Sequence, residues 1–206
     1  MKPDVIAITG DSIDHKGRLP VLAEFMDALD AAIPKIAILG NWEYWSGVDL
    51  TQLAALYERR NTKLLVNRSS TLDLKGKKVR FVGIDDLVGG TPDVRMSFED
   101  QSPVDAEGIL AHCPKHRDLV RDRPSLMLSG HTHGGQINLF GFAPFCPKGS
   151  GDFVRGWYGV EKPQGGERVI RLEGPAPLYV SRGLGTSIIP IRFDSTPELA
   201  RFELIV

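Results

Sequence analysis

The sequence predicts a mixed α/β protein, built from one mixed sheet or a pair of sheets with helices on the outside. Up to residue 60, short apolar runs that end near glycine alternate with segments of helical periodicity, which is the pattern of βαβ units with parallel strands. After residue 60, strand-like runs follow one another closely and are separated by turn signals. The 206 residues allow one substantial core, and we expect a single domain over residues 1–206.

The first elements can be assigned from periodicity. Apolar side chains recur at helical spacing in two segments, and two continuous apolar runs indicate buried strands. The predicted helices are residues 18–32 and 50–60, and the predicted strands are residues 5–9 and 36–39. Asp49 or Thr51 is expected to cap the second helix.

The later elements are shorter and are broken by Gly and Pro. Gly76–Lys77 is expected to form a hairpin turn, and the polar residues 89–103 a surface loop. Strands are predicted at residues 64–66, 70–74, 79–84, 108–111, 125–129, 154–157, 168–172, 178–181 and 199–206.

The composition excludes several classes of protein. The net charge is −1, so no strong positive field is available to hold nucleic acid, and a nucleic-acid partner is not expected. No stretch reaches the roughly 18 apolar residues of a membrane span, and the start does not read as a signal peptide. Cys113 and Cys146 fit no zinc module and are expected to be reduced, partly buried thiols.

Polar side chains follow several of the predicted strands. Asp11, Asn41, His112 and the pair His131 and His133 all stand where an apolar run ends. Because ligands of open α/β sheets bind at the carboxyl ends of strands, these side chains are candidates for one pocket. Taken singly, each also fits an ordinary turn or a hydrogen-bonded histidine.

The segment Gly-His-Thr-His-Gly-Gly-Gln at residues 130–136 is more specific. In an extended chain, His131 and His133 would face the same way, roughly 7 Å apart, a span that suits two metal ions about 3.5–4 Å apart. The glycines would let the backbone approach the ions closely. The alternative is a solvated loop, but the chain has only five histidines, which favours a metal site.

The motifs also occur in an informative order: Gly-Asp-x-x-Asp at residues 10–14, Gly-Asn-x-Glu at 40–43, His112, the segment 130–136, and a closing segment at 178–187. This order resembles the calcineurin-like metallophosphoesterase family, in its bacterial YkuE/YaeI-like branch, over nearly the whole chain. The resemblance implies two packed mixed β-sheets flanked by helices. It also implies hydrolysis of phosphomonoester, phosphodiester or pyrophosphate bonds in a small phosphorylated substrate.

The resemblance further implies a dinuclear centre of divalent metal ions that activates water. The mixed nitrogen and oxygen ligands suit Mn, Fe or Zn. The implied roles are Asp11 as the bridging ligand, Asn41, His112 and His131 as the rest of one site, His133 as part of the other, and Asp14 as an orienting residue behind the ligands.

One departure concerns the start of the chain. The family opens with an Asp-x-His motif on a first strand, and no such motif precedes Asp11. A mis-assigned start, a truncation or a real loss of the strand would each explain this. We therefore expect an N-terminally incomplete domain that lacks its first strand, with one metal site well formed and the second weak or empty. The exposed sheet region would favour self-association.

The second departure is Trp42, which stands where the family has a histidine, so no catalytic residue is assigned. Indole is no acid or base at neutral pH. Its presence indicates either substrates with acidic leaving groups, such as diphosphates, or simple packing together with neighbouring aromatic residues. The aromatic neighbours are Tyr44 and Trp45, and the residues that could replace the missing acid are Glu43, His15 and His116.

Three functional hypotheses remain open: an active phosphoesterase, a degenerate homologue that binds metal or a phosphorylated ligand with little turnover, and a structural interaction module. The last would make the ligand pattern a coincidence. Relatives in this branch are often tethered to membranes by an N-terminal segment. That segment is not found here, so we expect a cytoplasmic chain, peripheral to a membrane at most.

Overall fold

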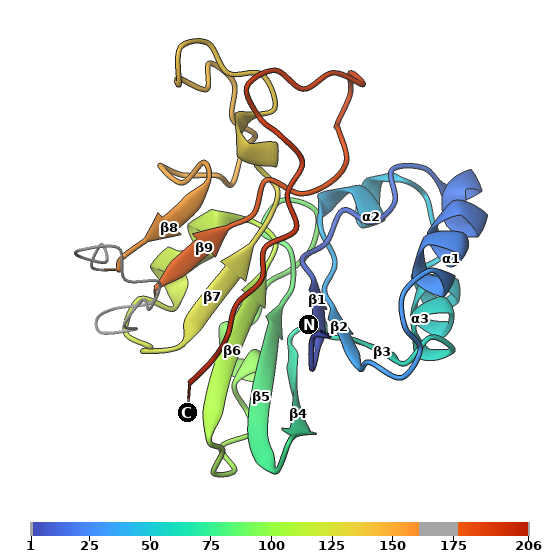
Figure 1. The fold of residues 1–206 in the computed structure, drawn as a ribbon, viewed down its shortest axis with the longest axis vertical. Coiled ribbons are helices and arrows are strands. Elements are labelled where there is room, and N and C mark those ends of the chain that lie inside the picture. The colour runs from blue at the N-terminus through green and yellow to red at the C-terminus, as the bar shows by residue number, and fades with distance from the viewer. Residues whose placement is uncertain (1, 161–176, 206) are drawn as a thin grey trace. The chain divides into compact units, whose positions relative to one another are not determined.

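The chain divides into two units in the computed structural model, Met1–His112 and Cys113–Val206, here called unit 1 and unit 2 (Figure 1). The structure describes residues 2–160 and 177–205. The strand predicted at residues 168–172 lies outside the described residues.

Unit 1 begins with a three-stranded parallel sheet in the order β1-β2-β3. Residue Ala7 of β1 lies opposite Ile36 of β2, which in turn lies opposite Lys63 of β3. Helix α1 connects the first two strands and α3 the next two, so the predicted βαβ arrangement is confirmed. The bounds are β1 Ile6–Ile8, α1 Leu19–Asp27, β2 Lys35–Ala37, α3 Leu50–Glu58 and β3 Thr62–Leu64.

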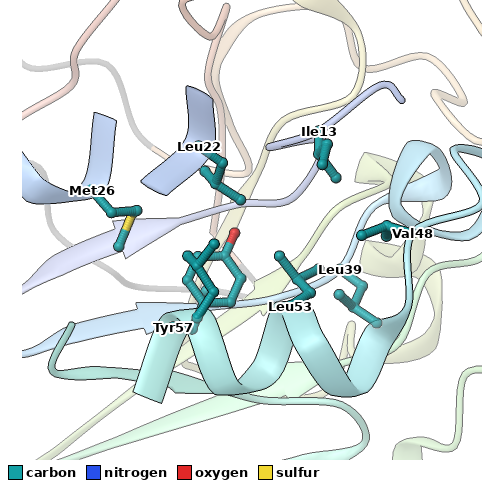
Figure 2. Packing of buried hydrophobic residues seen from close by; sticks show 9 residues of the cluster. Ile13, Leu22, Met26, Leu39, Val48, Leu53 and Tyr57 are labelled. Carbon is teal, nitrogen blue, oxygen red and sulfur yellow. The ribbon is translucent and has the colours of Figure 1, made fainter. Parts of the chain in front are cut away.

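The two helices bury their apolar faces in one cluster. Leu22 and Met26 of α1, and Leu53 and Tyr57 of α3, are each four residues apart and therefore lie on one side of their helix. Figure 2 shows these side chains converging with Leu39, which follows β2. Each such fully buried side chain contributes about 1.5–3 kcal/mol to folding, so this cluster fixes the helices on the sheet.

The start of α3 agrees with the sequence prediction, whereas the bounds of α1 do not. Asp49 caps α3, because its carboxylate accepts from the N–H of Thr51 and Gln52. Helix α1 is shorter than the predicted 18–32: a 3-10 turn, η1 (Lys16–Arg18), precedes it, and it ends at Asp27. The Asp30 carboxylate accepts from the Ala32 N–H, which is a turn conformation that competes with helix.

The second sheet of unit 1 contains β4 (Arg68–Leu74), β5 (Lys77–Ile84) and β6 (Ala106–Ala111). Strands β4 and β5 are antiparallel, and β5 and β6 are parallel. The hairpin turn lies at Lys75 and Gly76, one residue before the predicted position, and φ is positive at both residues as tight hairpins require. A short helix, α4 (Val94–Ser97), interrupts the predicted surface loop 89–103, with Asp93 as its cap.

The two sheets of unit 1 pack face to face. Ile36 and Ile38 point into a core shared with Val79, Phe81 and Leu110 of the second sheet. Ala37, between the two isoleucines, points to the helix side instead, as the alternation of side chains along a strand requires. The prediction of two packed sheets flanked by helices is therefore confirmed within this unit.

The described part of unit 2 contains three short strands and two 3-10 helices. Strand β9 pairs with β7 in parallel and with β8 antiparallel. The bounds are η2 Pro114–Leu119, β7 Leu126–Ser129, η3 His133–Gly135, β8 Gly156–Tyr158 and β9 Leu178–Val180. Cys113 is buried, Cys146 is exposed, and neither forms a disulfide.

The strand predicted at residues 199–206 is wrong, since residues 199–205 form no regular structure. A strand needs a hydrogen-bonding partner, and the sequence pattern alone does not supply one. This segment is held by an aromatic cluster instead: Phe202 packs edge to face on Trp157 and Tyr179. In the described part of the chain, no helix is long and apolar enough to cross a membrane.

Candidate metal centre

Asp11 lies two residues beyond the Thr9 that follows β1, in a backbone conformation with φ 55°. Its Oδ1 accepts from the backbone N–H of Trp42 at 2.9 Å, and its Oδ2 lies 3.0 Å from Nε2 of His112. Gly10 makes this approach possible: a Cβ there would lie 2.7 Å from Gly40 N and from His112 Nδ1. The carboxylate is thus fixed from two sides.

His112 is buried at the end of β6. Its Nδ1–H donates to the carbonyl of Thr9 at 2.6 Å, so Nε2 is the nitrogen that faces Asp11. Burial lowers the pKa of His112, but the charge of Asp11 and the two hydrogen bonds outweigh it and raise the pKa to about 9. A metal-ligating histidine usually donates one ring N–H to a backbone carbonyl or a carboxylate and binds the metal through the other nitrogen, and the Thr9 contact of His112 is of the first kind.

Asn41 is the first residue of α2 (Asn41–Trp45), a short helix that the sequence did not predict. The side chain is buried, and its Oδ1 has no hydrogen-bond partner among the described residues. An unsatisfied buried acceptor costs about 1–3 kcal/mol, which a cation would offset. An amide oxygen, a carboxylate and an imidazole are the kinds of oxygen and nitrogen donor that divalent metal ions take in proteins.

Glu43 ties the Asp11 and Asn41 loops together. Its buried carboxylate accepts the backbone N–H groups of Asp11, Ser12 and Gly40. Burial and then the charge of Asp11 raise the pKa of Glu43 to about 7, although the hydrogen bonds oppose this. The sequence suggested Glu43 as a substitute acid. Its spacing from Gly40, which is that of a capping box, was the signal for the positioning contacts that the structure shows.

Asp85 and Asp86 are two buried carboxylates that the sequence analysis missed. They follow β5, just as Asp11 and His112 follow their strands, and that placement was the available signal. The hydroxyl of Tyr44 donates to Asp85. The backbone of the following loop comes close to α2, since a Cβ on Gly89 would lie 3.0 Å from Asn41 Cα. This loop therefore supports the helix that carries Asn41.

Other predicted residues have different surroundings. Asp14 is exposed and pairs with Arg18 at 3.3 Å, so the structure does not support its predicted orienting role behind the ligands. Exposed His15 caps η1 by accepting from the Gly17 N–H. In unit 2, buried His116 donates from Nδ1 to the Cys113 carbonyl. Trp42 packs edge to face on Trp45, with ring centroids 5.8 Å apart.

The histidine segment of unit 2 is not extended, so the predicted strand geometry of His131 and His133 is wrong. Both have positive φ, 69° and 51°, and His133 begins η3. The Thr132 side chain accepts from the Gly134 N–H and closes a tight turn. Such conformations cost on the order of 1–3 kcal/mol each and cluster at functional sites. His131 donates from Nε2 to the Lys148 carbonyl at 2.8 Å, so a metal ion would have to be bound through Nδ1.

The closing segment of unit 2 holds the His133 backbone in place. The carbonyl of His133 accepts from Ser195 Oγ at 2.7 Å and from Arg192 Nη1 at 3.1 Å. Arg192 also donates to the carbonyls of Arg182 and Gly185. Sequence alone could not assign this role, because it depends on main-chain acceptors.

In unit 1 the structure thus brings three of the predicted ligand residues, Asp11, Asn41 and His112, close together. They follow the carboxyl ends of strands from two packed sheets. In unit 2 it places the other two, His131 and His133, on one strained segment. These features define an α/β protein with the donor set of a divalent-metal site.

The relationship to known proteins agrees with this class. Residues 1–135 match the calcineurin-like phosphoesterase family, and the chain belongs to that family. It is 33% identical to the metallophosphoesterase YkuE of Bacillus subtilis, over 98% of this chain and 68% of that protein. It is 28% identical to the phosphodiesterase YaeI of Escherichia coli (99% and 71%) and 28% identical to the metallophosphoesterase YkoQ of B. subtilis (98% and 72%).

Proposed function

We propose that this chain is a metal-dependent hydrolase of phosphomonoester, phosphodiester or pyrophosphate bonds. The observation that carries the proposal is the pair of Asp11 and His112, 3.0 Å apart. Each group is oriented from behind by a backbone partner, Trp42 N–H for Asp11 and the Thr9 carbonyl for His112. The relative YaeI, named as a phosphodiesterase, supports diesters as one substrate class.

The proposed ligand set is the one that the family resemblance implies. Asp11, Asn41, His112 and His131 would hold one metal ion, while Asp11 and His133 alone would hold a second ion weakly in this chain. The ions would supply Lewis-acid activation of the phosphate and of a water molecule. Asp11 contributes the negative charge, Asn41 a neutral oxygen, and Glu43 keeps both loops in register through the backbone N–H groups that it accepts.

Trp42 affects which substrates are expected. Its indole cannot protonate a leaving group, and general acid help is worth about 10²–10⁴-fold in rate. The chain should therefore favour substrates whose leaving group is already acidic, such as a diphosphate or a nitrophenolate.

The test compares hydrolysis of bis-p-nitrophenyl phosphate with Mn²⁺ by the unmodified chain, the Asp11→Asn variant and the Asp14→Asn variant. Asp14 is the matched control, because it is an exposed aspartate three positions along the same loop. We expect Asp11→Asn to lose activity by about 10²-fold or more and Asp14→Asn to keep it. Equal activity in all three would refute the proposal.

Metal content tests the ligand set separately. Elemental analysis of the purified 206-residue chain should find one tightly bound ion, and this ion should be missing from Asp11→Asn. Two tightly bound ions per chain would contradict the proposed weak second site.

A second candidate, a homologue that binds metal or a phosphorylated ligand without useful turnover, is favoured by Trp42. The same two experiments distinguish the two candidate functions. Metal binding that depends on Asp11, with no hydrolysis of the activated diester, would establish the second candidate function.

A further inference from the structure

Two loops of unit 2, residues 139–145 and 184–193, carry an unusual number of exposed apolar side chains. Nine of the large apolar residues in these loops are exposed, among them Phe140, Phe142 and Phe145 in the first loop and Ile188 and Ile191 in the second. We call these two loops the tip surface. Isolated exposed apolar residues are normal on soluble proteins, but a contiguous group marks an interaction site.

The two loops form one surface because they share a hydrogen-bonded base. The Asn138 N–H donates to the Phe193 carbonyl, and the Phe193 N–H donates to the Gln136 carbonyl. The side-chain amide of Gln136 donates to the carbonyls of Ser187 and Ile189 and accepts from the Ser187 N–H. In Figure 1 the two loops extend from unit 2 beyond its strands, in yellow-brown and red.

Phe140 lies in a tight turn of the first loop. Leu139 and Phe142 form a two-way backbone pair around Phe140 and Gly141, and φ is positive at both central residues. Such turn positions favour Gly, Asn or Asp, and an aromatic residue is strained there. The ring of Phe140 is also fully exposed. A strained side chain that packs on nothing in the described part of the chain does not help folding, which points to a contact outside the chain.

Charge around the tip surface identifies the kind of contact. Acidic residues number 26 in the chain, yet none occurs in residues 123–151 or 177–193, and exposed Asp194 directly follows the second stretch. Three cations lie in the second loop or within three residues of a loop in the sequence: Lys148, Arg182 and Arg192. Arg182 pairs with Glu198, whereas Lys148 is exposed and Arg192 donates to carbonyls and to the Ser195 hydroxyl, which are all uncharged acceptors.

Projecting aromatic and aliphatic side chains beside cations, on loops that themselves contain no carboxylate, fit the interface of an anionic bilayer, where apolar side chains enter the acyl boundary and cations meet phosphate. A second copy of the chain would bring the same cations against each other, which is unfavourable. We propose that the tip surface docks this protein on anionic lipid membranes, with Phe140 and Ile188 inserted. Docking is distinct from the proposed hydrolysis and requires no turnover.

Cosedimentation of the full chain with vesicles tests this inference. The vesicles contain phosphatidylcholine alone or mixed with phosphatidylglycerol, and the variant is the double substitution Phe140→Ser with Ile188→Ser. The matched control is Val21→Ser with Phe25→Ser, which also removes one exposed aliphatic and one exposed aromatic side chain, both from α1. We expect binding to the phosphatidylglycerol vesicles, about ten-fold weaker in the tip variant and unchanged in the control.

Three outcomes would overturn the inference: no binding of the unmodified chain to phosphatidylglycerol vesicles, equal binding by the tip variant, or light scattering that shows a dimer which the tip substitutions dissociate. Circular dichroism verifies that the variants fold. Hydrolysis of the soluble diester by the tip variant should be unchanged, so failure of docking and failure of the phosphoesterase proposal are separate results.

Discussion

Three of the five predicted ligands, Asp11, His131 and His133, adopt positive φ. None of these residue types takes that conformation without strain, and aspartate tolerates it better than histidine. The sequence offers these side chains as candidate ligands, because residue type and order at strand ends are visible in it, and their metal-binding role stays a prediction. It could not predict the backbone strain, which follows from contacts such as those of Gly10 with Gly40 and His112.

Glu43 provides the first residue-scale prediction. In Glu43→Gln one carboxylate oxygen becomes an NH₂ group, which cannot accept a hydrogen bond. At least one of the contacts with the backbone N–H groups of Asp11, Ser12 and Gly40 is therefore lost. We expect the affinity for Mn²⁺ to fall about 10–100-fold, the usual effect of losing a group that orients ligands. Isothermal titration measures it, and Glu24→Gln, an exposed glutamate of α1, is the control. An unchanged affinity would mean that Glu43 does not position the ligands.

Trp42 provides the second residue-scale prediction. The backbone N–H of residue 42 holds Asp11, and this contact survives a change of side chain. Trp42→His should therefore leave the metal site intact and add a group that can protonate a leaving group. Turnover of alkyl phosphodiesters should rise by about 10²-fold, with little change on bis-p-nitrophenyl phosphate. Trp45→His, which alters the exposed partner of the aromatic pair, should not raise it; if both variants behave alike, residue 42 has no special role.

At the scale of elements, hydrophobic periodicity was sufficient to predict a helix where its tertiary packing agrees with its local conformational preference. Helix α3 is both capped by Asp49 and amphipathic, and its predicted bounds nearly match. Helix α2 was missed because its five residues are too few for a periodic signal. It is stabilised by tertiary contacts, including those of Glu43 with the backbone of Asp11 and Ser12 and of Tyr44 with Asp85.

The element that depends most on long-range contacts is the histidine segment of unit 2. Arg192 and Ser195 both donate to the His133 carbonyl, so Arg192→Lys, which keeps the charge but loses the planar set of donors, should loosen η3. We expect a loss of about 1.5–3 kcal/mol in the free energy of unfolding, the usual worth of hydrogen bonds to a charged group.

Urea denaturation measures this loss, with Arg95→Lys as the control because Arg95 is exposed on α4. If Arg192→Lys unfolds at the same urea concentration as the control, the contacts of Arg192 with the closing segment do not stabilise the fold.

At the scale of the whole molecule, the five predicted ligands lie on four separate segments of the chain, with His131 and His133 together on one of them. Asp11, Asn41 and His112 are far apart in the chain, and only folding of unit 1 brings the Asp11 and His112 side chains together. The order of motifs was enough to predict the fold class, and the ligand residues that it indicates stay a prediction. The contacts of Arg192 were not predictable, because its acceptors are mostly backbone carbonyls that carry no sequence signal, whereas Glu43 and Asp85 each had a positional signal in the sequence.

This separation of the ligands along the chain gives the last prediction. The unfolded chain has no preformed site, so a metal ion binds the folded state and stabilises it by mass action. At Mn²⁺ about 100-fold above the dissociation constant, the gain is about 2.7 kcal/mol, which corresponds to a rise of roughly 5–10 °C in Tm for a chain of this size. Scanning calorimetry should show this rise for the unmodified chain and for Asp14→Asn, and chelation by EDTA should reverse it. Asp11→Asn should show none, because it lacks the carboxylate that faces His112; an equal rise in Asp11→Asn would place the stabilising ion elsewhere on the protein.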